Sequence, residues 1–81
     1  MMILVTGGLG YIGAHACVAL LNAGREVLII DDLSNSSRDV LDRIEAIAGR
    51  RPSFVQMSIR DTEGLAEVFA RHRIGAVMYF A

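Results

Sequence analysis

Three glycines at a fixed spacing follow the first apolar run of the chain, and they constrain its fold more than any other feature. The run over residues 2–5 leads into Gly8, Gly10 and Gly13, in the pattern Gly-x-Gly-x-x-Gly, and then into a helical stretch. In such a strand-to-helix turn, Gly8 permits the tight turn, Gly10 lets a ligand approach the backbone, and Gly13 lets the helix pack against the strand. We predict that the free N–H groups and the helix dipole of this turn bind a dinucleotide diphosphate.

Apolar runs and amphipathic stretches alternate along the rest of the chain. The runs predict four strands, over residues 2–5, 26–30, 53–56 and 76–80, and the stretches predict three helices, over residues 11–23, 38–48 and 62–71. The connections between strands are long enough for parallel crossovers. We therefore predict an α/β fold with a Rossmann-type open parallel sheet in strand order 3-2-1-4, which is an incomplete doubly wound fold.

Glycines and small polar residues mark the ends of the predicted helices. We expect left-handed residues after the helices at Gly24, Gly49 and Gly75. We expect N-cap oxygens from Ser36, Ser37, Asp61 and Thr62.

An acidic residue closes the second predicted strand, about 20 residues after the glycine turn, as in dinucleotide-binding folds. Asp31 is placed to accept hydrogen bonds from ribose hydroxyls, and its charge would repel the additional phosphate of NADP. No arginine follows it directly, so the sequence favours NAD. The polar loop Asp32-Leu33-Ser34-Asn35-Ser36 is placed to reach the same ribose, although residues 34–36 also fit a solvated turn.

Charge and composition argue against several classes of protein. The formal net charge is −1 and no basic run occurs, so we expect no nucleic-acid partner and no membrane partner. A single cysteine, Cys17, fits a reducing compartment, and the apolar start is too short for a signal peptide or a membrane span. We expect a cytoplasmic protein. We interpret Cys17, His15 and His72 as structural residues, and we predict no metal site.

The last predicted strand would lie at an edge of the sheet, and bare apolar edges promote self-association. A chain of 81 residues is also small for covering a sheet on both faces. We therefore expect residues 1–81 to form the N-terminal part of an NAD-binding domain, with the remainder of that domain and a substrate domain absent.

Two motifs carry a resemblance to a known family. They are Thr6-Gly7-Gly8-Leu9-Gly10-Tyr11-Ile12-Gly13-Ala14-His15 and the run from Asp31 to Ser36, with further matches at Ile59-Arg60-Asp61 and Val77-x-Tyr79-Phe80-Ala81. The chain resembles the extended short-chain dehydrogenases and, within them, the UDP-glucose 4-epimerases. The likeness covers essentially all of the chain and about the first quarter of such enzymes.

The resemblance implies that NAD is contacted at the glycine turn, the loop after the second strand and the ends of the later strands. The implied contacts are Gly7, Gly8, Gly10, Tyr11, Ile12, Gly13, Asp31, Asp32, Leu33, Ser34, Asn35, Ser36, Ser58, Ile59, Phe80 and Ala81. The chain departs from the family pattern at two places: Met57-Ser58 replaces the usual Gly-Asp, and Tyr79 replaces the usual His. A serine oxygen can still accept a hydrogen bond from adenine.

The resemblance also implies an activity, which is the interconversion of UDP-glucose and UDP-galactose through a 4-keto intermediate by a homodimer. In such enzymes a Tyr-x-x-x-Lys pair drives proton transfer. This chain has two tyrosines, Tyr11 and Tyr79, and no lysine, so we predict that it holds no catalytic residue and is inactive alone. Two alternatives stay open: an NAD-dependent nucleotide-sugar dehydratase or decarboxylase, and a non-catalytic nucleotide-binding module.

Overall fold

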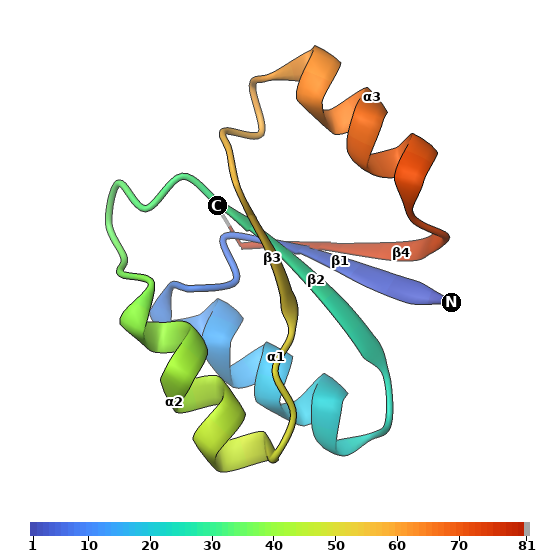
Figure 1. The fold of residues 1–81 in the computed structure, drawn as a ribbon. Helices are drawn as coiled ribbons and strands as arrows, with labels where there is room; N and C mark the ends of the chain where they lie inside the picture. The colour runs from blue at the N-terminus through green and yellow to red at the C-terminus, as the bar shows by residue number, and fades with distance from the viewer. Residues whose placement is uncertain (81) are drawn as a thin grey trace.

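Four parallel strands form one sheet, with helices on both of its faces (Figure 1). The computed structural model describes residues 1–80. The strands are β1 (Met2–Thr6), β2 (Glu26–Asp31), β3 (Ser53–Gln56) and β4 (Ile74–Tyr79), and the helices are α1 (Tyr11–Asn22), α2 (Asp39–Ala48) and α3 (Thr62–Arg71). The order β3-β2-β1-β4 confirms the predicted fold class and strand order. The largest difference is at β4, which begins at Ile74 rather than at residue 76.

The register of the sheet brings the carboxyl ends of all four strands to one edge. Thr6 at the end of β1 lies opposite Ile30 of β2 and Tyr79 of β4, and Asp31 lies opposite Gln56 of β3. Backbone bonds continue this pairing beyond the strands, because Phe80 N donates to the Thr6 carbonyl at 2.9 Å. The loops that follow β1, β2 and β3 therefore start side by side, as expected for a parallel sheet.

Alternate residues of the central strands enter two separate apolar cores. Val5 and Ile29 face α1 and α2, where Cys17, Leu21 and Ile44 pack against them. Leu4, Leu28 and Ile30 face the opposite side, where they meet Val68 of α3. In Figure 1, α1 and α2 lie on one side of the strands and α3 lies on the other. Burial on both faces explains why these strands read as continuous apolar runs.

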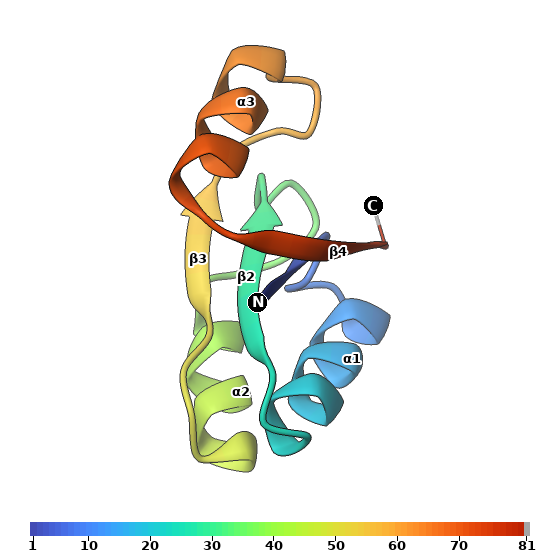
Figure 2. The same cartoon turned by 90° about the vertical axis from the view of Figure 1, so that its right-hand side faces the viewer.

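Strand β4 forms an open edge of the sheet. Figure 2 views the molecule from the side of β4, and no helix of residues 1–80 lies in front of that strand. Val77 is 51% exposed and Tyr79 is 65% exposed, whereas Val5 on the neighbouring β1 is fully buried. The edge position expected from the strand order is thus confirmed.

The predicted helix ends are confirmed at some positions and wrong at others. Gly24 and Gly49 are left-handed, with φ of 80° and 76°. Gly75 is not: it lies inside β4, because α3 ends in the extended residue His72 and the chain passes straight into the strand.

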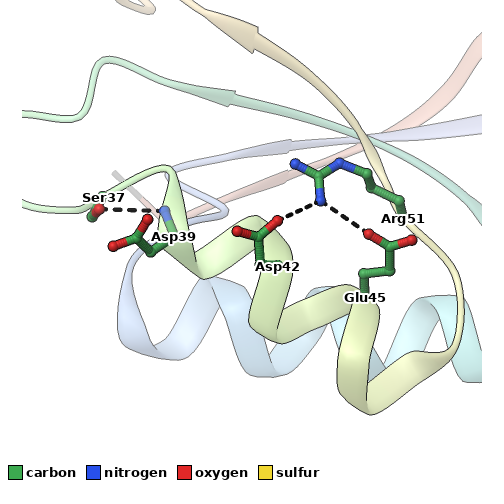
Figure 3. Close-up of polar contacts among 5 residues, drawn as sticks. All are labelled: Ser37, Asp39, Asp42, Glu45 and Arg51. Atoms are coloured by element: carbon green, nitrogen blue, oxygen red, sulfur yellow. Dashed lines mark hydrogen bonds and ion pairs between the residues drawn. The ribbon is translucent and has the colours of Figure 1, made fainter.

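The predicted N-caps show a similar division. Asp61 caps α3, because its Oδ1 accepts from Gly64 N at 2.9 Å, so Thr62 is the first helical residue and not the cap. Ser36 is not a cap either, since its hydroxyl donates to the Asp31 carboxylate. Ser37 is not the N-cap of α2 either, because that residue is Arg38, although Ser37 Oγ accepts from the first helical residue, Asp39 N, at 3.3 Å (Figure 3).

Gly49 offers a test of backbone strain that is free of packing effects, because no atom lies within 4 Å of the position a Cβ would take. We expect Gly49→Ala to lower the free energy of unfolding by about 1 kcal/mol, since alanine disfavours the left-handed region. Asparagine tolerates that region better, so Gly49→Asn should lower the free energy of unfolding by less. Urea unfolding measures the stabilities of the parent and the two variants, and an alanine variant as stable as the parent would contradict the expectation.

One arginine links α2 to the turn before β3. Arg51 Nη1 lies 2.8 Å from Asp42 Oδ1 and 3.0 Å from Glu45 Oε1 (Figure 3). Its hydrogen bonds to these carboxylates raise the pKa of Arg51. The groups are exposed to solvent, so the cluster orients the turn more than it stabilises the fold.

The thiol of Cys17 is fully buried beneath the glycine turn, where it donates to the Gly8 carbonyl at 3.9 Å. Burial raises the pKa of Cys17 to about 12 from the ordinary value of 9.0. The stabilisation from the neutral thiol is therefore complete below about pH 9 and is lost as the pH rises towards about 12.

We expect the parent to lose more stability than Cys17→Ala when the pH rises from about 8 to about 10, because only the parent carries this thiol. Urea midpoints at the two pH values measure the loss. Equal losses in the two proteins would show that the thiol does not titrate on unfolding. Iodoacetamide should likewise modify Cys17 only in the unfolded chain.

Candidate functional site

A cavity of about 660 Å³ opens where the carboxyl ends of the strands meet, a size typical of small-ligand sites. Residues from all four strand ends and the loops after them line it. They are Gly7, Gly10, Ile30, Asp31, Asp32, Ser34, Asn35, Ser36, Met57, Ser58, Ile59, Arg60, Tyr79 and Phe80. The cavity lies at the point where the strand order reverses, which is the usual ligand position in open α/β sheets.

The tight turn after β1 is made at Gly7, and not at Gly8 as predicted. Gly7 has a φ of 68°, in the left-handed region. Gly8 is needed for a different reason: a Cβ there would lie 2.7 Å from Cγ2 of Ile29 on the neighbouring strand. The glycine at position 8 therefore lets the turn pack against β2.

The third glycine has its predicted role. A Cβ on Gly13 would lie 2.3 Å from the Gly7 carbonyl oxygen and 2.9 Å from Gly8 Cα, so only glycine lets α1 pack this closely on the turn. Gly10 differs from both, because its Cβ would meet nothing nearer than the Gly7 carbonyl oxygen at 3.4 Å. Gly10 lies in the cavity wall, where a side chain would take space from a ligand.

Helix α1 begins at this turn without an anionic or side-chain cap. Its N-cap is Gly10, no side chain bonds to the first turn, and that turn contains no acidic residue. The positive end of the helix dipole is therefore available to an anion at the cavity. Tyr11 and Ile12 are 82% and 66% exposed on the first turn and do not line the cavity.

Asp31 ties the glycine turn to the loop after β2. The residue is 9% exposed; Oδ2 accepts from Leu9 N at 3.1 Å, and Oδ1 accepts from Leu33 N at 2.8 Å and from the Ser36 hydroxyl at 2.9 Å. The bond to Leu33 N also holds that residue at a φ of 64°. A carboxylate offers about four acceptor sites, so a further donor can still bind from the cavity. This structural role of Asp31 was not predicted from the sequence.

The loop after β2 folds on itself at the cavity rim. Asp32 Oδ1 accepts from both the backbone N and the hydroxyl of Ser34, at 3.0 and 2.8 Å. These bonds, with a smaller contribution from the positive charge of Arg60, lower the pKa of Asp32. Ser34 and Asn35 are exposed but line the cavity, so the loop is a solvated turn that also faces the site.

The segment after β3 supplies a wall that sequence analysis predicted only in part. Ser58 and Ile59 line the cavity, as do Met57 and Arg60, which were not predicted. Tyr79 and Ile30 were not predicted either. All four lie at or within a few residues of the carboxyl end of a strand, at the same sheet edge, and that position is the signal which could have identified them.

Several predicted contacts lie outside the cavity wall. Gly8 and Gly13 are buried behind the turn, and Leu33 packs against the core beneath α1 and α2. Ala81 lies outside the described residues. Within residues 1–80, no three metal-ligating side chains come together, and no helix has the length and apolarity needed to cross a bilayer.

Together, the parallel sheet, the uncapped helix at a glycine turn and the acid at the end of β2 define a nucleotide-binding unit of the Rossmann class. Residues 4–81 match the sequence model of the GDP-mannose 4,6 dehydratase family. The chain belongs to this family.

Similar proteins of known name agree with the predicted resemblance. The chain is 49% identical to a UDP-glucose 4-epimerase of Bacillus subtilis, over all of its own length and 24% of that protein. It matches the structure of a UDP-glucose 4-epimerase from Stenotrophomonas maltophila with bound NAD and formylated UDP-arabinopyranose, at a TM-score of 0.97 and 51% identity, over 100% of the chain and 24% of its counterpart.

A second solved structure, the Bifidobacterium longum UDP-glucose 4-epimerase in complex with NAD+ and UDP, matches at a TM-score of 0.96 and 38% identity, again over 100% and 24% of the two chains. The resemblance to UDP-glucose 4-epimerases is thereby confirmed. The chain spans about a quarter of the length of the relatives that it matches.

Proposed function

We propose that this chain binds NAD as the N-terminal part of the cofactor domain of a UDP-glucose 4-epimerase. The observation that carries the proposal is the cavity that joins the uncapped start of α1, at Gly10, to the carboxylate of Asp31. A helix start suits a diphosphate, and a carboxylate at the end of β2 suits ribose hydroxyls. The relatives solved with NAD support the assignment.

The residues of the cavity fit the parts of this dinucleotide in order along the sheet edge. Gly10 leaves room for the diphosphate, because it carries no side chain in the cavity wall. Asp31 keeps an acceptor for the adenosine ribose, with Ser36 beside it, and Ser58 lies one strand further, where adenine would lie. Phe80, after β4, lines the opposite end of the cavity.

Calorimetric titration of the chain with NAD and then with NADP tests this assignment. We expect saturable binding of NAD and at least about tenfold weaker binding of NADP, because the carboxylate of Asp31 would oppose the 2′-phosphate. Equal affinities would contradict the ribose role of Asp31. An absence of binding to either would contradict the proposed cofactor site.

We propose the whole-enzyme activity from the relatives, and its chemistry comes from the cofactor. The bound dinucleotide would supply hydride acceptance from C4 of a UDP-sugar and hydride return to the other face. Residues of this chain would hold and orient the dinucleotide. The chain contains no lysine for a Tyr-x-x-x-Lys pair, so we expect no turnover by residues 1–81 alone. A cytoplasmic homodimer is proposed for the whole enzyme.

A second candidate has one observation in its favour, which is that the matching family model is named for a GDP-mannose 4,6 dehydratase. The two activities give different products. An enzyme that contains this chain should convert UDP-galactose to UDP-glucose if it is an epimerase, whereas a dehydratase should release water and a 4-keto-6-deoxy sugar. Product analysis with UDP-galactose and GDP-mannose separates them.

A further inference from the structure

We propose that the part of this cavity that holds the base accepts a 6-oxopurine about as well as adenine. The reason is that the side chain which hydrogen-bonds to the base there is the uncharged hydroxyl of Ser58. The inference rests on the proposed NAD site. It concerns which dinucleotides that site admits.

The position of the base follows from how β3 joins β2. Met57 N donates to the Asp31 carbonyl at 3.2 Å, so the segment after β3 continues beside the end of β2. Residues 57–60 line the cavity there. A ribose bound by Asp31 at the end of β2 therefore places its base over this segment, since the adenosine half of a dinucleotide extends from β1 across the end of β2.

The apolar part of this wall does not distinguish one purine from another. Met57 and Ile59 are half-buried and pack against the core formed by Leu4, Leu28 and Ile30. Their positions are fixed by that core, and their side chains offer a base only apolar contact. Such contact depends on the area of the ring and not on the substituent at C6.

The polar part of the wall can pair with either substituent. Ser58 Oγ accepts from Arg60 N at 3.1 Å, which uses one of its two lone pairs. One lone pair remains for the amino group of adenine, and the O–H remains for the carbonyl oxygen of hypoxanthine. The neighbouring carboxylate, Asp61, caps α3 and does not line the cavity, and Arg60 adds only donors, which suit a carbonyl oxygen.

Titration with NAD and with nicotinamide hypoxanthine dinucleotide tests the proposal. We expect the two dissociation constants to differ by less than about fivefold, because each base can form one hydrogen bond to Ser58. A larger preference for NAD would overturn the proposal while leaving NAD binding intact. If neither dinucleotide binds, the proposed cofactor site itself fails.

A carboxylate at position 58 should make the site prefer adenine to the 6-oxopurine. We expect Ser58→Asp to raise the preference for NAD by about tenfold, because an acceptor-only side chain pairs with the amino group and repels the carbonyl oxygen. Ser53→Asp is the matched control: it adds the same charge at the other end of β3, outside the cavity, and should leave the ratio unchanged.

Ser58→Ala tests in a second way whether the Ser58 hydroxyl hydrogen-bonds to both bases. Both dinucleotides should lose affinity to a similar extent, because neither base can then pair with position 58. An unchanged ratio in Ser58→Asp, or a loss confined to one dinucleotide in Ser58→Ala, would show that another group reads the base.

Discussion

Replacing Gly13 by alanine is expected to unfold the chain or come close to it. The added Cβ would lie 2.3 Å from the Gly7 carbonyl oxygen and 2.9 Å from Gly8 Cα, and both are backbone atoms that cannot rotate away. Overpacking of this kind costs about 3 kcal/mol or more where the backbone must move, a large share of the stability of a small domain. Circular dichroism with urea unfolding measures the loss.

Gly10→Ala is the matched control, because the same methyl group enters the same turn three residues earlier. Gly10 has φ −74° and ψ 172°, which alanine adopts freely, and its Cβ would meet only the Gly7 carbonyl oxygen at 3.4 Å. We expect nearly unchanged stability and about tenfold or greater loss of NAD affinity, because the methyl group would enter the diphosphate position. Equal destabilisation by the two variants would show that the close packing at Gly13 is not what requires glycine.

Removing the carboxylate of Asp31 is expected to damage both the fold of the site and its ligand binding. Asp31→Ala leaves the buried Leu9 N, Leu33 N and the Ser36 hydroxyl without their acceptor. We expect a loss of about 2 kcal/mol in the free energy of unfolding, because a buried donor without a partner carries its full desolvation cost. NAD affinity should fall by more than about tenfold, since the ribose also loses its acceptor.

Two further variants separate these effects. Asp31→Asn retains one acceptor oxygen, so it should lose less stability than Asp31→Ala while still weakening NAD binding. Asp42→Ala removes an exposed carboxylate of α2 that lies outside the cavity, and it should leave NAD affinity unchanged. An Asp31→Ala protein that stays stable and binds NAD normally would contradict both roles of this carboxylate.

The agreement between sequence and structure is closest where a feature depends on near neighbours in the chain. The apolar runs of the strands, the apolar stripes of the helices and the left-handed Gly24 and Gly49 all arise within a few residues. Gly75 shows the limit of this reasoning. A glycine after a helical stretch is a common helix end, but here pairing with β1 draws the chain into β4 before that residue.

The candidate site was predicted at the level of segments and less well at the level of atoms. The glycine turn and the acid at the end of β2 are local patterns, and both lie at the cavity. The bond between Asp31 and Leu9 joins residues 22 positions apart, so no local pattern contains it. Met57 and Arg60 likewise become part of the wall only because β3 lies beside β2.

By itself, therefore, the sequence determined the order of strands and helices, the parallel sheet and the position of a glycine turn at a helix start, because each follows from periodicity and backbone freedom over short stretches. The tertiary structure decided why each glycine is needed, what Asp31 holds in place and which side chains surround the cavity. Those properties depend on distances between segments that are remote in the chain, and only the packed sheet sets these distances.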